Sequence, residues 1–354
     1  ISPFMTNASD PAIDSNPANG VGSVWANTTS GEMFICTDAT AGENVWINVG
    51  AGTGDVQSYS FQGTISGYTA GGRNSGNVDI NTIDKFSLVT DGNATDVGDL
   101  TTGRRGNAGS KSSTHGYAAG GHNIGDVEVT TIDRYSFSVD GNASTVGNLT
   151  LRRTDQTGQS SSTHGYASGG QYGPTATFYD IIDKFSFVSE GTATDVGDLT
   201  RAAGESPGGH SSETHGYTSG GYITAGPYNV IDRFSFSVDG NATDVGDMSS
   251  ARQNPSGTSS TTHGYTSGGY LSGTYTNIID KFQFTSSANA TDIADLTVGR
   301  SAAAGISSTT HGYCSGGNGP ITNVIDKFTF ASDANATDVG DITVARLYGS
   351  GTQI

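Results

Sequence analysis

The chain has 354 residues, of which 16 are basic and 34 acidic, so its formal net charge at neutral pH is −18. Nucleic acids and anionic membrane surfaces both select positively charged protein faces, so this balance argues against both kinds of partner. Hydrophobic residues make up only 33% of the chain, a value typical of disorder, but the 53 glycines and regular aromatic residues indicate thin, closely packed sheets instead. No apolar run of 18 residues and no signal peptide is recognisable, so we expect no transmembrane helix.

Two segments precede the repeated part of the chain. Residues 1–20 are rich in Pro, Asn, Asp and Ser, which predicts an extended N-terminal arm. Residues 21–55 contain three strand-like runs, and Trp25, Phe34 and Trp46 are expected to form a minimal core. A unit this small usually needs a staple or a partner, because below about 40 residues a chain buries too little surface. We therefore expect a β module that either docks on the rest of the chain or attaches it to other subunits.

From residue 56 onward the chain is repetitive. The phrase Thr-His-Gly-Tyr-x-x-Gly-Gly recurs five times, and a sixth copy has Ser66 in place of the histidine. Successive copies lie 49, 49, 51, 48 and 48 residues apart. A fixed period of this length indicates a repeat architecture. The copies occupy residues 65–72, 114–121, 163–170, 214–221, 262–269 and 310–317.

Each period contains the same further features in the same order. An alternating, aromatic-rich run such as IDKFSL (83–88) predicts a strand, and a tight Asp-Gly-Asn turn such as 91–93 follows it. A second run such as ATDVGDL (94–100) predicts another strand, after which an arginine occurs. Four short strands per period of about 50 residues are typical of a propeller blade. Six periods therefore predict an all-β fold with six four-stranded blades, spanning residues 56–354.

This order of features resembles the kelch repeat, in which Gly-Gly ends the second strand and an aromatic strand follows. The chain departs from that family by lacking the usual Trp in the fourth strand. The tyrosines before each Gly-Gly are expected to supply the missing bulk between blades. They are Tyr68, Tyr117, Tyr166, Tyr217, Tyr265 and Tyr313.

The two ends of the repeated region are expected to meet. Residues 346–354 match the stretch that follows the arginine in other repeats, and they stop where a second strand would begin. We predict that they form the first strand of the blade whose other strands come from residues 64–100. This pairing would close the ring.

A second resemblance concerns residues 22–46 and the phrases IDKFTF, NATDVGD and SSTTHGY. They look like a short module and repeats found in tail-fibre and related virion proteins of marine tailed phages, cyanophages especially. The resemblance implies a particle-associated or host-binding role, with residues 1–55 contacting other virion proteins. It also implies a virion-surface or extracellular location.

No constellation in the sequence predicts catalysis. The repeated histidines occupy equivalent positions in different blades, too far apart to share a metal, so each is expected to bond within its own blade. His122 with Asp126 and Glu128, and His210 with Glu205 and Glu213, lack a nucleophile–base spacing. The acidic turns have calcium-like alternation but lack the Gly and Glu of an EF-hand loop, which leaves calcium open. We expect no enzyme activity, no cofactor and two free thiols, Cys36 and Cys314.

The connections between the second and third strands differ most from repeat to repeat. They occupy residues 73–82, 122–131, 171–181, 222–230, 270–278 and 318–324. Loops on a rigid scaffold carry function, and exposed aromatic side chains suit sugar rings or protein partners. The alternative is that these side chains only pack the loops. The predicted contact residues are Tyr172, Phe178, Tyr179, Tyr222, Tyr228, Tyr270 and Tyr275.

The repeated Ile-Asp-Lys/Arg strands predict ion pairs between blades. Asp84 and Lys85 point to opposite faces of their strand, as do their counterparts. The acidic face of one blade is expected to meet the basic face of the next. The arginines after the fourth strand compete for the same carboxylates. They are Arg104, Arg152, Arg201, Arg252, Arg300 and Arg346.

Together these features predict a non-enzymatic phage virion component: a tail fibre, adhesin or surface decoration that binds a host receptor or a neighbouring virion protein. A homo-oligomer is expected. The alternatives are a secreted microbial carbohydrate-binding or glycan-active propeller, and a purely structural ring in a tail assembly.

Overall fold

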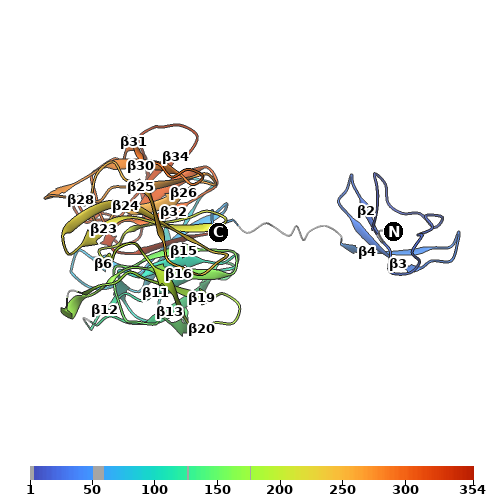
Figure 1. Ribbon diagram of the computed structural model, residues 1–354, viewed down its shortest axis with the longest axis horizontal. Helices are drawn as coiled ribbons and strands as arrows, with labels where there is room; N and C mark the ends of the chain where they lie inside the picture. The colour runs from blue at the N-terminus through green and yellow to red at the C-terminus, as the bar shows by residue number, and fades with distance from the viewer. Residues whose placement is uncertain (1–3, 51–59, 126, 176) are drawn as a thin grey trace. The chain divides into compact units, whose positions relative to one another are not determined.

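The structure is a computed structural model that describes residues 4–50, 60–125, 127–175 and 177–354. It divides the chain into two compact units, Ile1–Tyr59 and Ser60–Ile354. The predicted boundary after residue 55 lies outside the described residues. Both units consist of β-strands (Figure 1), so the all-β prediction is confirmed.

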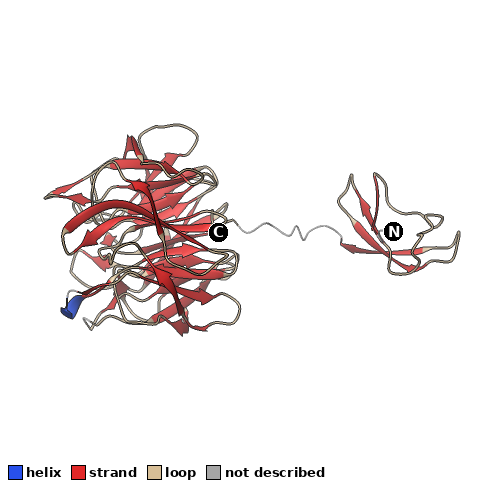
Figure 2. Cartoon of the chain, in the orientation of Figure 1, coloured by secondary structure: helices blue, strands red, loops and turns tan. Residues whose placement is uncertain are grey.

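Helical structure is almost absent. Among the described residues the one helix is a 3₁₀ turn, η1 (Gly173–Thr175), which stands out in Figure 2 against strands and loops. No helix in this part of the chain is long and apolar enough to cross a membrane.

The smaller unit is a four-stranded sheet in the order β1-β2-β3-β4. Residues 4–7, within the predicted arm, form the edge strand and pair parallel with β2, while the other pairs are antiparallel. Trp25 and Trp46 meet edge to face at 5.8 Å, and the Trp25 indole donates to the Ser9 carbonyl at 2.9 Å. Trp25 and Cys36 are buried, whereas Phe34 is only half-buried. The strands are β1 (Phe4–Asn7), β2 (Val24–Asn27), β3 (Met33–Asp38) and β4 (Val45–Gly50).

The larger unit contains six sheets of four antiparallel strands, numbered here in chain order. Sheet 1 is β37 (Ser350–Gln353), β5 (Ser66–Ala70), β7 (Thr82–Ser87) and β8 (Thr95–Asp99); sheet 2 is β10 (Ala108–Lys111), β11 (His115–Ala119), β13 (Thr131–Ser136) and β14 (Ser144–Asn148); sheet 3 is β15 (Thr157–Ser160), β16 (His164–Ser168), β19 (Ile181–Ser186) and β21 (Thr194–Asp198). Sheet 4 is β22 (Gly208–Ser211), β23 (His215–Ile223), β24 (Gly226–Ser235) and β25 (Thr243–Asp247); sheet 5 is β26 (Ser256–Ser259), β27 (His263–Ser267), β30 (Ile278–Gln283) and β31 (Thr291–Asp295); sheet 6 is β32 (Ala304–Ser307), β33 (His311–Ser315), β34 (Val324–Thr329) and β35 (Thr337–Asp341).

Shorter strands supplement these sheets. The strand β20 (Gly191–Thr192) pairs parallel with β14 at the edge of sheet 2. Four two-stranded hairpins or bridges lie at the ends of the sheets. They are β9 (Arg104–Arg105) with β12 (His122–Asn123), β17 (Gln171–Tyr172) with β18 (Thr177–Phe178), β28 (Tyr270–Leu271) with β29 (Thr274–Tyr275), and β36 (Arg346–Leu347) with β6 (Arg73–Asn74).

The C-terminal strand completes sheet 1, as predicted. In β37, Gly351 lies opposite Thr69 and Gln353 lies opposite Gly67 of β5. The first strand of this sheet therefore comes from the end of the chain and the other three from residues 66–99. The prediction that the last residues supply the missing first strand is confirmed.

The first strands of neighbouring sheets approach very closely at a glycine. A Cβ atom placed on Gly158 would lie 1.9 Å from the carbonyl oxygen of Gly109, and one on Gly351 would lie 2.1 Å from that of Gly305. Equivalent contacts link sheets 1 to 2, 3 to 4, 4 to 5 and 5 to 6, so each first strand touches those of two other sheets. Any side chain would hold these strands apart. The six glycines are Gly109, Gly158, Gly209, Gly257, Gly305 and Gly351.

The sheets are also joined by aromatic pairs. The ring of Tyr265 in sheet 5 stacks on Phe330, beyond the third strand of sheet 6, at 4.7 Å, and Tyr117 stacks on Phe187 at 4.8 Å. All six tyrosines that precede Gly-Gly are at most 3% exposed. The prediction that they fill the space between sheets is confirmed, and they provide much of the apolar burial that a glycine-rich chain needs.

Candidate functional site

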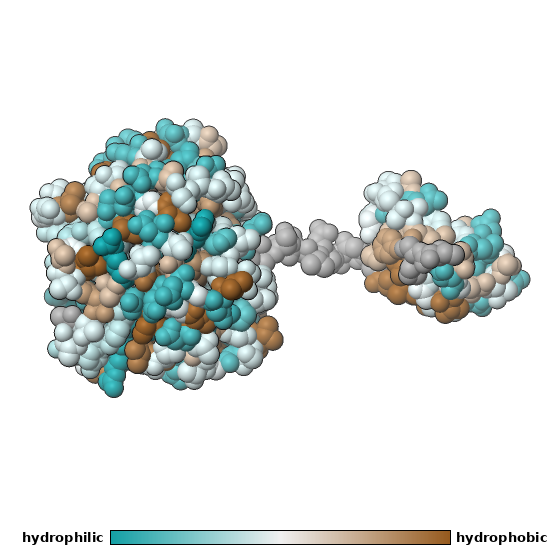
Figure 3. Space-filling model, viewed as in Figure 1, coloured by the Kyte–Doolittle hydropathy of each residue, from teal (hydrophilic) through white to brown (hydrophobic). Residues whose placement is uncertain are grey.

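The variable connections and the fourth-to-first connections lie on one surface, called here the loop face. Backbone pairing shows this directly, because each fourth-to-first connection bonds to the following variable connection: Gly204 with Tyr222, Gln253 with Tyr270 and Ser301 with Asn318. In Figure 3 the visible surface of the larger unit carries hydrophobic residues only in small, separate areas.

Six of the seven predicted contact residues are half-buried on this face: Tyr172, Phe178, Tyr179, Tyr222, Tyr270 and Tyr275. Most pack against a neighbour. Phe178 meets Tyr222 of the next sheet at 6.0 Å, Tyr270 meets Tyr275 across its own hairpin at 5.1 Å, and the Arg152 guanidinium lies over Tyr172 at 5.9 Å. These side chains are held in place and still present part of their surface to solvent.

Tyr228 differs from the expectation. It is only 7% exposed and packs with Ala203 and Val230. The reason is local: β23 and β24 continue without a break into the loop face, and the register brings Tyr228 opposite Gly221. Burial also raises the pKa of its phenol. Tyr228 is a core residue and not a contact residue.

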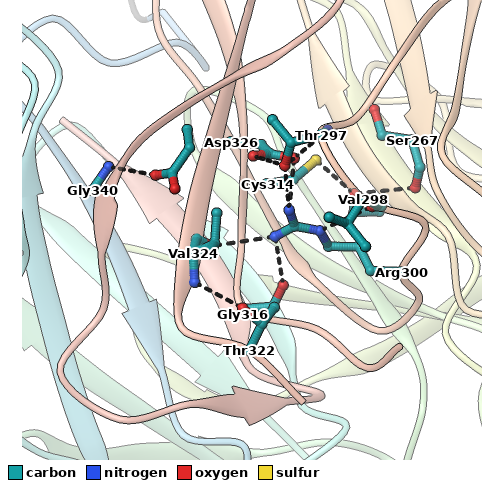
Figure 4. A network of polar contacts seen from close by, with 12 residues as sticks. Ser267, Thr297, Val298, Arg300, Cys314, Gly316, Thr322, Val324, Asp326 and Gly340 are labelled. Carbon is teal, nitrogen blue, oxygen red and sulfur yellow. Dashed lines mark hydrogen bonds and ion pairs between the residues drawn. The ribbon is translucent and has the colours of Figure 1, made fainter. Parts of the chain in front are cut away.

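Beneath the loop face lies a layer of buried ion pairs. Arg300 donates to Asp326 at 2.7 Å, to Thr297 Oγ1 at 3.1 Å and to the carbonyls of Gly316 and Val324 (Figure 4). Thr297, in the connection from the previous sheet, donates its backbone N–H and hydroxyl to the same carboxylate. The Asp326 carboxylate thus holds the connection between sheets 5 and 6 against the third strand of sheet 6. The other pairs are Arg104–Asp133, Arg153–Asp183, Arg252–Asp280 and Arg346–Asp84.

These contacts correct the predicted ion pairing. The strand carboxylates pair with the arginines. The basic residue that follows each of these aspartates in its strand pairs instead with an acidic residue in the hairpin turn of the next sheet. Lys184, for example, contacts Asp239 at 2.8 Å, where both side chains are partly exposed. In the second repeat Arg153, not Arg152, takes the buried position. The other outer pairs are Lys85–Asp140, Arg134–Glu190, Lys281–Asp333 and Lys327–Asp91.

Sheet 4 breaks this pattern. Ala203 occupies the position of the arginine, and the predicted Arg201 is exposed. The Asp232 carboxylate is 1% exposed and accepts the Thr200 N–H at 2.9 Å and the Thr200 hydroxyl at 2.7 Å, with no guanidinium among its bonded partners in the described chain. Burial raises the pKa of Asp232. Its five counterparts each have an arginine.

A ring of hydrogen bonds joins the six fourth-to-first connections at the centre of the loop face. Each connection donates a backbone N–H to the carbonyl of the one before it, for example Asp155 to Gly106 at 2.8 Å and Tyr348 to Ala302 at 2.8 Å. The residues involved have φ between 43° and 62°, a strained region for side chains other than glycine. The ring surrounds a cavity of about 90 Å³. Its members are Gly106, Asp155, Glu205, Ser206, Asn254, Ala302 and Tyr348.

Two carboxylates make this centre acidic. Asp155 accepts a hydrogen bond from Gln171 at 2.9 Å, and Glu205 accepts one from Gln253 at 2.5 Å. Burial raises the pKa of both, and the neighbouring Asp155 charge raises the pKa of Glu205 further.

Of the two histidine clusters singled out in the sequence, the one around His210 does not form, whereas His122 pairs with Glu128 through a backbone bridge and the third member of that cluster, Asp126, lies outside the described residues. His122 lies 3.8 Å from Asp79. His210 is buried between Thr258 and Ser219, and its bonds go to these residues and not to Glu205 or Glu213. Among the described residues no group of three His, Cys, Asp or Glu side chains could hold a metal.

The repeated histidines and both cysteines behave as predicted. Each histidine bonds through Nδ1 to the hydroxyl of the preceding threonine at 2.8 Å, as in His115 with Thr114. Burial lowers the pKa of all five of these imidazoles. Cys36 and Cys314 are free and buried.

We predict that His210 makes the chain acid-sensitive. Burial lowers its pKa to about 4, so between pH 6.5 and 4 the unfolded chain binds a proton that the folded chain does not. Stability is therefore lost as pH falls through this window, by about 1.4 kcal/mol per pH unit from this group. The His210→Gln variant should show a correspondingly flatter stability profile in urea unfolding. Glutamine suits the site because Gln159, at the same position in sheet 3, bonds to the equivalent serine, Ser168, and to a carbonyl of the next sheet. An unchanged slope would contradict the assignment.

No protein-family model matches the chain, and no curated protein is significantly similar to it.

Proposed function

We propose that the six sheets are the blades of a six-bladed, kelch-type β-propeller. Support comes from the glycine contacts, which link the first strand of every sheet to both of its neighbours. The hydrogen-bonded ring of connections supports the same arrangement, because it passes through all six sheets and returns to its start. Four-stranded sheets placed radially leave only short edges, which suits a chain of many short strands.

The protein is a non-enzymatic component of a phage virion that binds a host-surface receptor or a neighbouring virion protein through the loop face. The observation that carries this proposal is the contrast within each repeat. The scaffold of tyrosines, glycines and arginine pairs is repeated, while the hairpins of the loop face differ and carry the partly exposed aromatic side chains. Variable side chains on a rigid support are typical of binding proteins. Residues 1–55 would attach the propeller to other virion proteins.

A secreted carbohydrate-binding or glycan-active protein is the second candidate. The observation that favours it is one tyrosine pair on the loop face: the ring centroids of Tyr270 and Tyr275 lie 5.1 Å apart with their planes tilted, and both side chains are partly exposed. Aromatic faces of this kind suit the apolar faces of sugars. A cell-surface glycan fits both candidates, which differ in whether the protein is part of a particle.

The test is binding of the purified chain to a glycan array and to a panel of intact cyanobacterial strains. The double variant Tyr222→Ala, Tyr270→Ala should lose at least tenfold in affinity for any surface that the native chain binds, because partly buried aromatic residues dominate such interfaces. Its melting temperature should fall only slightly, since both side chains lie at the rim of their sheets.

The matched control is Val238→Ala, in a hairpin turn between the third and fourth strands. Val238 is 69% exposed, so its loss should change neither binding nor stability. Equal loss of binding in the control and the double variant would overturn the assignment of the loop face. Hydrolysis of an array glycan by the native chain would instead support an enzyme.

A further inference from the structure

The first strands of the six sheets line an inner cavity of about 60 Å³ on the side of the glycine contacts away from the loop-face ring. One position in each strand faces this cavity, and four of the six residues there are serine. The set is Lys111, Ser160, Ser211, Ser259, Ser307 and Gln353. The repeat therefore has one position at which a lysine replaces a small hydroxyl.

The serine oxygens are already used as acceptors. Ser160 Oγ accepts the Lys111 N–H at 2.9 Å, Ser211 Oγ accepts the Ser160 N–H at 3.0 Å, and Ser259 Oγ accepts the Ser211 N–H at 3.1 Å. Ser307 Oγ continues the series by accepting the Ser259 N–H at 2.9 Å. These bonds fix each hydroxyl oxygen at the wall of the cavity.

The same four serine hydroxyls can also donate a hydrogen bond. A serine hydroxyl is one donor as well as an acceptor. None of these four donates to any acceptor in the described part of the chain, although their residues are only 3–9% exposed. Buried donors are normally satisfied. Four O–H groups on the wall of one small cavity therefore point to an acceptor inside it.

Lys111 adds a positive charge to the same cavity. Its residue is 5% exposed, and its ammonium lies 3.4 Å from the carbonyl oxygen of Gln62, next to Phe61 at one end of the cavity. Burial lowers the lysine pKa to about 8, which still leaves most molecules protonated at neutral pH. An ammonium and several hydroxyl donors form an environment that favours an acceptor with negative charge.

We propose that this inner cavity binds a small monovalent anion of the size of chloride, held by the Lys111 ammonium and the hydroxyls of Ser160, Ser211, Ser259 and Ser307. The ion would accept hydrogen bonds from the serine hydroxyls and would interact favourably with the ammonium. Because the residues come from five sheets, the bound ion would also tie the first strands together. The inference is independent of what the loop face recognises.

The first experiment compares thermal unfolding of the full chain in sodium chloride and in sodium gluconate at equal ionic strength. Gluconate is too large for the cavity, so chloride at several times its Kd should raise the Tm of the native chain by about 2–4 °C. The Lys111→Ser variant, which restores the residue found in four other sheets, should lose this difference. The control Lys184→Ser removes a partly exposed lysine and should keep it.

The second experiment locates the ion with bromide as the probe. Crystals of the native chain soaked in sodium bromide should show an anomalous peak within about 3.5 Å of Lys111 Nζ, and Lys111→Ser crystals should not. A cavity that contains only water in bromide, or a chloride effect on Tm that survives in Lys111→Ser, would overturn the proposal. This result would leave the binding role of the loop face untouched.

Discussion

Replacing Arg153 with leucine should lower the free energy of unfolding by about 3–5 kcal/mol. The Asp183 carboxylate is fully buried and receives the guanidinium at 2.9 Å together with two bonds from Thr150. Removing the arginine leaves a buried charge with incomplete compensation, which costs much more than the pair itself contributes. Urea-induced unfolding measured at pH 7 would give the difference.

The adjacent residue provides a matched control. Lys184 follows Asp183 in the same strand, but its partner Asp239 is half exposed, so Lys184→Met should cost at most about 1 kcal/mol. Similar losses for Arg153→Leu and Lys184→Met would show that burial does not distinguish the two layers of ion pairs.

Sheet 4 gives an internal comparison. Asp232 already lacks an arginine, and burial raises its pKa above the unfolded value. A carboxyl whose pKa is raised on folding weakens the fold as pH rises through that pKa. Asp232→Asn should therefore leave stability at pH 7 unchanged or increase it, whereas Asp183→Asn should reduce it.

The Gly158→Ala substitution should destabilise the fold by about 3 kcal/mol, near the upper end of the range for overpacked cores. The added Cβ would lie 1.9 Å from the Gly109 carbonyl oxygen, and this contact is with backbone, so no side-chain rotation can relieve it. The first strands of sheets 2 and 3 would have to separate. The loss of stability would be measured by thermal unfolding, in comparison with an alanine substitution at a glycine that has free space around it.

Gly240→Ala is the matched variant. Gly240 lies in a hairpin turn where a Cβ would meet nothing within 4 Å, so the change should stay within about 0.5 kcal/mol. A Gly158→Ala protein as stable as Gly240→Ala would mean that the first strands are not in tight contact.

Much of this fold could be predicted because the sequence repeats. Six copies of one pattern reveal the strand order, and the unmatched residues 346–354 reveal which strand closes sheet 1. The buried role of the tyrosines follows from the absence of any other bulky side chain at that position. Periodicity reports what the repeats share, and the shared features are the scaffold.

What the repeats do not share was harder to predict. The apolar residue directly after the fourth strand lies four positions before the buried arginine, and counting from it would have identified Arg153 after Leu149 and the substitution by Ala203 after Leu199. The burial of Tyr228 depends on β23 and β24 running on into the loop face, which residue types alone do not indicate. The sequence offered Asp183 two kinds of partner, a basic strand residue of the neighbouring sheet and an arginine after a fourth strand. Only the distances in the structure distinguish between them.

The closed arrangement of six sheets is the central claim, and hydrogen–deuterium exchange of the full chain tests it most directly. The backbone amides of Ser350–Gln353 should exchange as slowly as those of Ala304–Ser307, the equivalent strand of sheet 6, because both are first strands paired on a sheet and in contact with two neighbours. Exchange of the C-terminal peptide as fast as that of the 91–93 turn would contradict the closure of the ring.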